Sequence, residues 1–292
     1  MGSARWSKGG GGLESNWAIW LDRLASSASS RTSPAELSKL AKDPSEMIRE
    51  VVASNPKTPA KDLSRLARDE WPSVREKAAG NVHTLPADLI LLAEDRDERV
   101  RGYVGGNPNT PKHILFRLAC DECTEVREQV ASNRSAPVAA LLELARDSYW
   151  VTRCKVAHNS NTPALVLLEL ANDPDGGART AAEKNRALSV AALTDLAEDQ
   201  DFLIRCQVAA CRKTPGRVVE KLADDPVSAV RASAAANKRV SVKALERLAK
   251  DRDPAVQRAL AENPHTPPEA LELLLKTAQG ETWTTASQRL RL

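Results

Sequence analysis

The sequence predicts an all-α solenoid of about nine and a half repeats of 26 residues, without a β-sheet. Two observations carry this prediction. The chain aligns with itself at steps of 26 residues, without a gap, from residue 32 to residue 265. Its apolar residues are mostly alanine and leucine, and aromatic residues make up only 3% of the chain, a composition that favours closely packed helices over strands.

The strongest positions of the repeat, numbered from residue 32, lie in its first half. Position 9 is leucine in all ten copies, and positions 10 and 12 are alanine and aspartate in all nine full copies. Position 6 is leucine except for Val219. Positions 6, 9 and 10 form an apolar stripe with helical spacing, so each repeat is expected to begin with a short helix.

The ends of the helices are predicted from capping residues. Thr58-Pro59 and Thr110-Pro111 are typical of an N-cap residue followed by proline at the first helical position. A second short helix, buried at positions 17, 21 and 22, is expected to end at position 24. This position is asparagine in eight of nine repeats, and asparagine tolerates the left-handed conformation that often ends helices. Two helices in 26 residues are compact, so one is expected to be very short or partly 3₁₀.

The pattern TPxxLxxLAxDxxxxVRxxVAxNP resembles the leucine-rich repeat variant family over about residues 32–275. The resemblance implies a HEAT-like, right-handed solenoid that alternates α and 3₁₀ helices, and it implies little about function. A member of that family carries an iron–sulfur cluster in a cysteine-rich N-terminal segment. Residues 1–31 of this chain contain no cysteine, so no cofactor is expected.

The sequence outside the repeats predicts two flanking segments. Residues 1–15 are rich in glycine and serine and are expected to be disordered, while residues 16–31 are expected to form a capping helix. That helix would turn Trp17, Trp20, Leu21 and Leu24 toward the first repeat. The solenoid is expected over 32–276 and a polar tail over 277–292. No signal peptide or membrane span is apparent, which favours a cytoplasmic protein, and the ungapped repeats suggest a bacterial source.

Aspartate at position 12 and arginine at position 18 form the most regular polar set. The same pair in every repeat cannot be a unique active site, so a ladder of bonds within and between repeats is expected. Cys120, Cys123 and Cys154 are candidates for a metal site because the first two have ligand-like spacing. A fourth ligand is not evident, so free thiols are favoured and no metal site is assigned.

Departures from the consensus are the better candidates for function. Positions near the end of the second helix become basic in later repeats, and equivalent positions would stack into one basic ridge. The basic ridge comprises Arg134, Lys184, Arg186, Arg212, Lys213, Arg217, Lys238, Arg239 and Lys243. It could follow a phosphate backbone or an acidic protein, or it could be a solvated edge.

Aromatic residues in the turn between the two helices are the second departure. Trp71, Tyr149, Trp150 and Phe202 would be interaction anchors if exposed, and fillers of the turn if buried. Repeat 6 also departs, because its turn reads Asp175-Gly176-Gly177 and Glu183 replaces a small residue. A bend or a binding notch is expected there.

These features predict a non-catalytic scaffold or adaptor that binds a protein or peptide along the solenoid, with no catalytic residues and no membrane partner. The alternative is nucleic-acid binding through the basic ridge of repeats 4–9. A minority form of that alternative is an enzyme, because the stretch DSYWVTR from Asp147 to Arg153 distantly resembles HEAT-like alkylpurine DNA glycosylases. Both residues occupy ladder positions, which favours a structural role.

Overall fold

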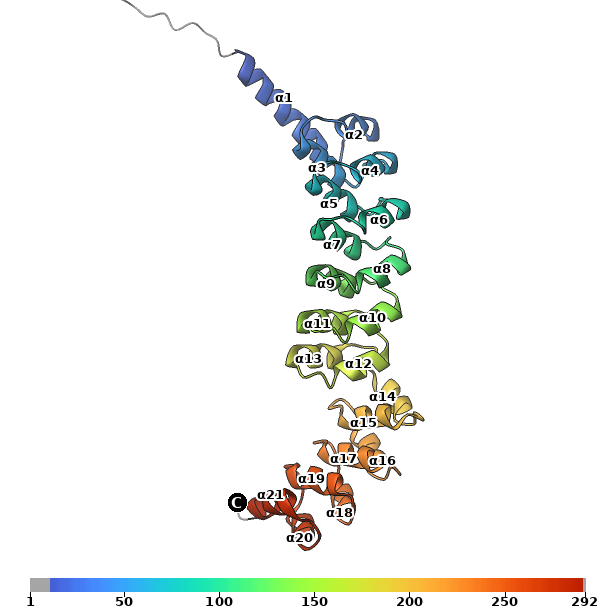
Figure 1. Ribbon diagram of the computed structural model, residues 1–292, viewed down its shortest axis with the longest axis vertical. Helices are drawn as coiled ribbons and strands as arrows, with labels where there is room; N and C mark the ends of the chain where they lie inside the picture. Colours follow the sequence, from blue (N-terminus) through green and yellow to red (C-terminus); the bar gives the residue numbers. More distant parts are fainter. Residues whose placement is uncertain (1–10, 291–292) are drawn as a thin grey trace, which may run out of the picture. The chain divides into compact units, whose positions relative to one another are not determined.

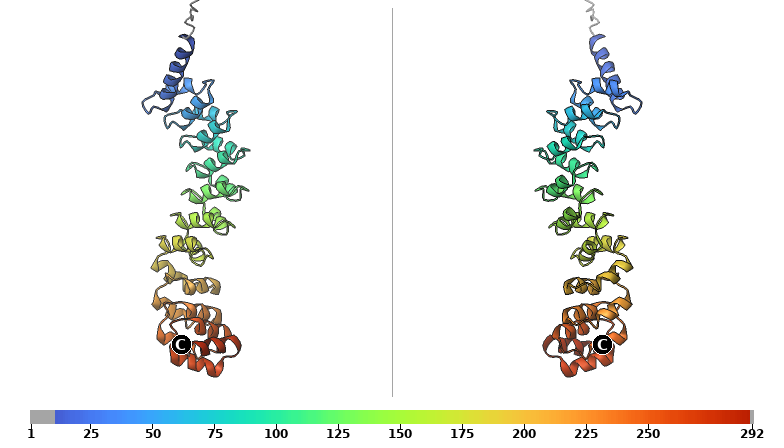
Figure 2. Two further views of the ribbon diagram at one scale, coloured as in Figure 1. Left: turned by 90° about the vertical axis from the view of Figure 1, so that its left-hand side faces the viewer. Right: turned by 90° about the vertical axis from the view of Figure 1, so that its right-hand side faces the viewer.

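The computed structural model describes residues 11–290, with the side chains described from residue 18 onward. In this range the chain forms twenty-one α-helices and no strand (Figures 1 and 2), which confirms the all-helical repeat fold. The chain divides into two compact units, residues 1–144 and 145–292, and each is described by itself. No helix in the described range is long and apolar enough to cross a membrane.

Unit 1 contains a long first helix followed by repeats that each hold one helix of seven residues and one of nine. In order, the helices are α1 (Gly11–Ala28), α2 (Pro34–Leu40), α3 (Glu46–Ser54), α4 (Ala60–Leu66), α5 (Pro72–Gly80), α6 (Pro86–Leu92), α7 (Glu98–Gly106), α8 (Lys112–Leu118), α9 (Thr124–Ser132) and α10 (Val138–Leu144). The longer helices α3, α5, α7 and α9 stack on one another in chain order (Figure 1).

Unit 2 continues the same alternation and closes with two longer helices. Its helices are α11 (Trp150–His158), α12 (Ala164–Leu170), α13 (Gly176–Lys184), α14 (Val190–Leu196), α15 (Phe202–Ala210), α16 (Gly216–Leu222), α17 (Ser228–Ala236), α18 (Val242–Leu248), α19 (Pro254–Glu262), α20 (Pro268–Thr277) and α21 (Gly280–Leu290). The expected polar tail is therefore largely helical, and α21 packs on α19 and α20.

The core consists of the predicted repeat positions. Leucines at positions 6 and 9 and valines at position 17, such as Leu115, Leu118 and Val126, are almost entirely buried. The expected 3₁₀ helices are not observed in the described range, because the short helices are α-helical. Bonds of the 3₁₀ type occur at the ends of the helices and in the turns, as from the Asp121 amide to the Leu118 carbonyl.

The second helix ends at the predicted asparagine, but not in the left-handed conformation, and the predicted N-cap role of the threonine is wrong. The Thr58 hydroxyl is buried and donates to the Val52 carbonyl at 2.5 Å, so Pro59 takes the N-cap position. Asn81 ends α5 in an extended conformation, with φ −73° and ψ 128°. Its buried amide donates to the carbonyls of Ala53 and Asn55, at 2.8 and 3.0 Å, and thereby joins two consecutive repeats.

The predicted ladder of aspartate and arginine is confirmed. Arg75 donates from Nε and Nη2 to the two carboxylate oxygens of Asp95 in the next repeat, at 2.6 and 2.9 Å. Nη1 of the same guanidinium donates to the Asp69 carbonyl of its own repeat at 2.8 Å. Burial disfavours the charge on Asp95, but the bonds from Arg75 and a backbone amide outweigh it and hold the pKa of this carboxyl below its ordinary value.

The capping helix α1 starts at Gly11, earlier than expected, and covers the first repeat only in part. Leu21 is 54% exposed, so its predicted burial is wrong, whereas Trp20 and Leu24 are half-buried. The Trp17 side chain and residues 1–10 lie outside the described part of the chain. At the other end, Arg289 of α21 donates to the carbonyls of Ala261 and Asn263, where an asparagine would stand in a further repeat.

The stacking within unit 2 is interrupted between repeats 6 and 7, where a bend or notch was expected. Helices α13 and α15 do not pack together as α11 packs on α13 and α15 on α17; instead α15 contacts α12. No ion pair joins Arg179 to Asp199 among the described residues, and Cys211 replaces the bridging asparagine. Leu196 and Ile204 are only half-buried, although their equivalents in other repeats are buried.

Candidate functional site

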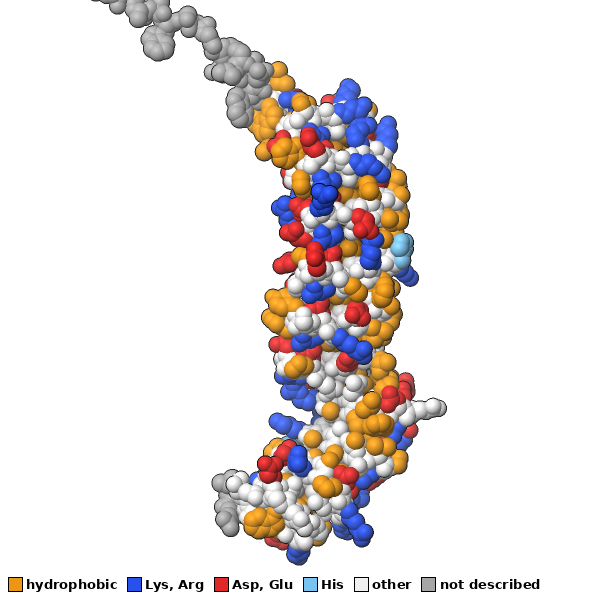
Figure 3. Space-filling view, in the orientation of Figure 1, with side chains coloured by type: hydrophobic (Ala, Val, Ile, Leu, Met, Phe, Trp, Pro, Cys, Tyr) orange, Lys and Arg blue, Asp and Glu red, His pale blue; other side chains and the backbone are white. Residues whose placement is uncertain are grey.

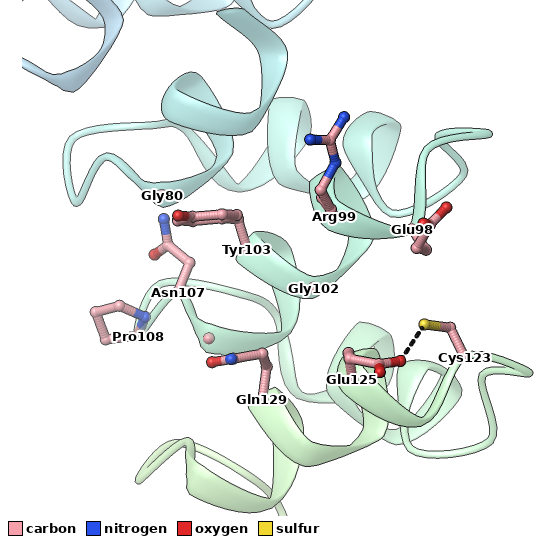
Figure 4. A pocket seen from close by; sticks show the side chains of 11 residues that line it. Gly80, Glu98, Arg99, Gly102, Tyr103, Asn107, Pro108, Cys123, Glu125 and Gln129 are labelled. Atoms are coloured by element: carbon pink, nitrogen blue, oxygen red, sulfur yellow. Dashed lines mark hydrogen bonds between the residues drawn. The ribbon is translucent and has the colours of Figure 1, made fainter. Parts of the chain in front are cut away.

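A groove on the longer helices of unit 1 has a volume of about 720 Å³ (Figure 4). It lies between α7 and α9 and reaches the end of α5. Its wall includes Tyr103, Arg99 and Glu98 from α7 and Gln129 and Glu125 from α9. Because every lining residue belongs to one unit, the hollow is a feature of this unit alone.

Glycines open the groove. Gly102 stands at position 19, where the other repeats carry Glu, Cys, Thr, Ala or Arg. A Cβ atom added to Gly102 would meet only Gln129 Cγ, at 3.9 Å, so the space beside it is open. Glycine in a helix costs about 1 kcal/mol relative to alanine. No close contact in the structure requires this glycine, and its effect is to leave the groove empty.

Gly105 has a different role from Gly102. An added Cβ would lie 3.1 Å from Val130 Cγ2 and 3.4 Å from the Val126 carbonyl oxygen. Gly105 therefore allows the close approach of α7 to α9. Gly102 and Gly106 line the groove, whereas Gly105 serves the packing of α7 on α9.

Tyr103 forms the aromatic wall and is 43% exposed. Its ring lies against Gly80 of α5, where an added Cβ would come within 2.8 Å of the ring, so a larger residue would displace it. The Lys77 ammonium lies 5.4 Å from the ring centroid. The ring is thus held by α5 while it lines the groove.

Sequence reasoning missed this site. Neither Gly102 nor Tyr103 was among the residues expected to bind a partner. The available signal was Gly102, at a position where the other repeats carry a larger residue, directly before the aromatic Tyr103.

The basic ridge lies mainly in unit 2, whereas Arg134 belongs to unit 1. Lys184, Arg186, Arg217, Lys238, Arg239 and Lys243 are exposed and make no ion pair within the described range. The other two members serve the interrupted junction. Lys213 Nζ donates to the Asn185 carbonyl at 3.2 Å, and Arg212 Nε lies 3.4 Å from a carboxylate oxygen of Glu183.

A small pocket of about 300 Å³ accompanies two members of the basic ridge. Lys184 and Arg186 line it together with His158 and Asn185. His158 Nδ1 is already 2.9 Å from the Cys154 carbonyl, one turn earlier in α11. The two unpaired cations make this pocket the part of the basic ridge best suited to an anionic group.

The four turn aromatics are exposed, as expected of anchors and not of fillers. Trp71, Tyr149, Trp150 and Phe202 have exposed fractions of 42 to 48%. Tyr149 and Trp150 are neighbours, with ring centroids 6.4 Å apart. Their predicted role in binding remains a prediction.

The cysteines do not converge on a metal site in the described range. Cys120 is exposed, Cys123 donates to Glu125 Oε2 at 3.0 Å, and Cys154 Sγ lies 3.6 Å from His158 Nδ1. Burial and the nearby Asp175 raise the pKa of the Cys154 thiol, which disfavours a reactive thiolate. All five cysteines are free thiols.

Asp147 and Arg153, the residues behind the glycosylase hypothesis, take ladder positions. Arg153 donates to both carboxylate oxygens of Asp173, at 2.6 and 2.9 Å, and to the Asp147 carbonyl at 2.8 Å. The guanidinium is 14% exposed and fully used by these bonds. The ladder accounts for this arginine without a catalytic role.

Comparison with known proteins supports the repeat family. A family model described as leucine rich repeat variant matches residues 124–148 and 150–175, two consecutive repeats. Both segments carry the pattern that runs without a gap from residue 32 to residue 265. No curated protein has significant similarity to the chain.

Several solved structures of helical repeat proteins are similar to the chain. One, described as a leucine-rich repeat variant with a novel repetitive structural motif, is 26% identical, with a TM-score of 0.39, over 76% of this chain and 88% of its own. The YibA protein of E. coli is 18% identical, with a TM-score of 0.31, over 100% and 99%. A designed armadillo repeat protein in complex with a (KR)4 peptide is 16% identical, with a TM-score of 0.16, over 97% and 95%.

Proposed function

We propose that this chain, a protein of leucine-rich repeat variant repeats, is a non-catalytic scaffold that binds a segment of a protein in the groove between α7 and α9. The observation that carries the proposal is Gly102. A Cβ atom there would meet only Gln129 Cγ, at 3.9 Å, and would favour the helix, yet the residue is glycine and lines a groove of about 720 Å³ beside an exposed tyrosine.

The exposed aromatic residues extend the proposal. Tyr103 lines the groove and Trp71 stands in the turn before α5, and both belong to unit 1. Aromatic side chains at the centre of an interface contribute much of its binding energy. We expect Tyr103 to be the main anchor, because the glycines beside it leave room for a partner side chain.

Selection from a displayed library of random peptides against the full chain tests the proposal. Peptides selected on the wild-type chain should lose at least ten-fold in affinity for Gly102→Leu, which fills the groove. Ala232→Leu, at the same repeat position in unit 2, is the matched control and should leave their affinity unchanged. Peptides that bind both variants as well as the wild type would place binding elsewhere and contradict the proposal.

Nucleic-acid binding is the second candidate, and the unpaired cations of unit 2 favour it. Lys184 and Arg186 share a pocket, and Lys238 and Arg239 are exposed without an ion pair in the described range. Binding of a labelled single- or double-stranded oligonucleotide should weaken steeply with salt, and Lys184→Glu with Arg186→Glu should abolish it. Equal binding by this double variant would reject the candidate.

The non-catalytic part of the proposal has its own test. Incubation of the chain with alkylated DNA should release no free base, since the Arg153 guanidinium is used by the ladder. Release of a base, lost in Trp150→Ala, would overturn the proposal in favour of a glycosylase.

A further inference from the structure

The surface around the groove is acidic, whereas the equivalent surface of unit 2 is not. At positions 13–16, 19, 20 and 23, repeats 1–4 carry nine acidic and three basic residues, a net charge of −6. The same positions in repeats 5–9 carry four of each. None of the twelve charged residues in unit 1 is buried, and Figure 3 shows acidic side chains gathered over α5 to α9. A groove in such a surface attracts a cationic partner.

The cations at and beside the groove, Arg99 on its wall and Lys77 next to Tyr103, are paired with neighbouring carboxylates. Lys77 Nζ lies 2.8 Å from Glu76, and Arg99 lies 3.1 Å from Asp97 in the preceding turn. Two carboxylates on the wall have no such partner: Glu98 makes no ion pair within the described range, and Glu125 bonds only to the Cys123 thiol. That bond lowers the pKa of the Glu125 carboxyl, so the group stays ionised at neutral pH.

The remaining wall can accommodate the aliphatic stem and the charged end of a long cationic side chain. Tyr103 offers an aromatic ring and Gly102 and Gly106 leave room above the α7 backbone, while Glu98 and Glu125 stand at the other end of the groove (Figure 4). The aliphatic stem of an arginine can pack along a tyrosine ring while its guanidinium bonds to carboxylates further along the groove. Gln129 is exposed, so its amide is available to bond to the backbone of a bound segment.

We propose that the groove between α7 and α9 recognises an arginine side chain of a basic partner segment, with lysine accepted more weakly. The inference rests on the proposed function and adds the chemical class of the partner. The stem of the arginine lies along Gly102 and Tyr103, and its guanidinium meets Glu98 and Glu125. The charge of the whole face favours further basic residues on either side of that arginine.

Fluorescence anisotropy with four labelled nonapeptides tests the inference on the full chain. The peptides alternate serine with arginine, lysine, glutamate or citrulline, the last being a neutral analogue of arginine. We expect the arginine peptide to bind at least ten-fold more tightly than the citrulline peptide, lysine to fall between them and glutamate not to bind. Equal affinities for arginine and citrulline would overturn the inference.

Two variants locate the charge that is recognised. Glu98→Gln with Glu125→Gln should weaken the arginine peptide at least ten-fold and leave the citrulline peptide unchanged. The matched control, Glu262→Gln with Glu269→Gln, removes the same charge from unit 2 and should change neither affinity. An unchanged arginine affinity in the first variant would overturn the inference even if binding is salt-dependent.

The inference and the proposed function can fail separately. If library-selected peptides lose affinity for Gly102→Leu but carry no arginine or lysine, the groove binds a segment and its proposed charge preference is wrong. If none of the four labelled nonapeptides binds, the inference is wrong. The library selection then decides the proposed function independently.

Discussion

The junctions between repeats in unit 1 and the junction between repeats 6 and 7 in unit 2 show two ways in which a repeat array departs from uniformity. In unit 1, α5, α7 and α9 keep every inter-repeat bond, and the departure is confined to outward glycines that open a groove. Between α13 and α15 the bonding residues themselves change, so that the stacking is interrupted.

The comparison teaches that the bonds at positions 18 and 24 hold the register, more than the apolar stripe does. Repeats 6 and 7 keep the leucines at positions 6 and 9, including Leu193 and Leu196. Nevertheless Leu196 is only half-buried. At its junction, the ion pair between Arg179 and Asp199 and the bridging asparagine are both absent among the described residues. Apolar burial is non-directional, whereas charge-assisted and amide bonds fix the geometry of a junction.

Low pH is expected to have the largest effect on the regular junctions, because it protonates the aspartates of several arginine–aspartate pairs at once. Arginine holds the pKa of Asp95, Asp121, Asp173, Asp225 and Asp251 below the ordinary value despite burial. The folded pKa lies below the unfolded one, about 3.9, so this stability is present above that pH and is lost as the pH falls through the folded pKa. Thermal unfolding followed by circular dichroism should show a melting temperature that is flat down to about pH 5 and falls below pH 4.

Replacing the ladder arginine should cost more stability at a regular junction than at the interrupted one. Arg75→Ala removes four bonds, two of them to the carboxylate of Asp95, and should lower the free energy of unfolding by about 1.5–3 kcal/mol. Arg179→Ala removes only the bonds to the carbonyls of Asp173 and Pro174 and should cost less than half as much. Urea titration of both variants measures this difference, and equal losses would refute the account of the interrupted junction.

The asparagine bridge gives a pair of changes with opposite signs. Asn81→Ala removes the bonds to the carbonyls of Ala53 and Asn55, of which Asn55 keeps the bond from the Thr58 amide, and should cost about 1–3 kcal/mol. Cys211→Asn restores the consensus residue between repeats 6 and 7 and should stabilise the chain by about 0.5–1.5 kcal/mol. Hydrogen exchange should then slow in α13 and α15. Faster exchange there would show that another feature, such as Glu183, causes the interruption.

The glycines of the groove should respond least, and also with opposite signs. Gly102→Ala adds a methyl group in open space and should stabilise the chain by about 0.5–1 kcal/mol. Gly105→Ala brings a methyl group within 3.1 Å of Val130 and should destabilise it. Thermal melts of the two variants measure both effects. A destabilising Gly102→Ala would mean that this glycine serves packing and not the groove.

Periodicity made the fold predictable, whereas the site depends on a single copy of the repeat. Leu118, Asp121 and Arg101 recur at fixed positions, so their burial and bonding followed from the repeat. Thr58 and Asn81 were recognised as residues at helix ends, but their side-chain bonds to the carbonyls of Val52 and Ala53 were not predicted. The sequence alone does not reveal which carbonyls stacking brings near.

The groove could not be predicted because it depends on empty space. A helical glycine can allow a close contact, as Gly105 does, or leave a hollow, as Gly102 does, and the sequence does not distinguish the two. The departure at repeat 6 was recognisable since Glu183 stands where other repeats have alanine or glycine. Its consequence, the loss of packing between α13 and α15, required the structure.

Hydrogen-exchange mass spectrometry of the full chain, with and without a library-selected peptide, tests the central claim most directly. The account predicts slower exchange over residues 98–129, which hold α7, α9 and the connecting segment that includes α8, and no change over repeats 6–9. Slower exchange over the basic ridge instead, or over no part of residues 98–129, would contradict the assignment of binding to the groove between α7 and α9.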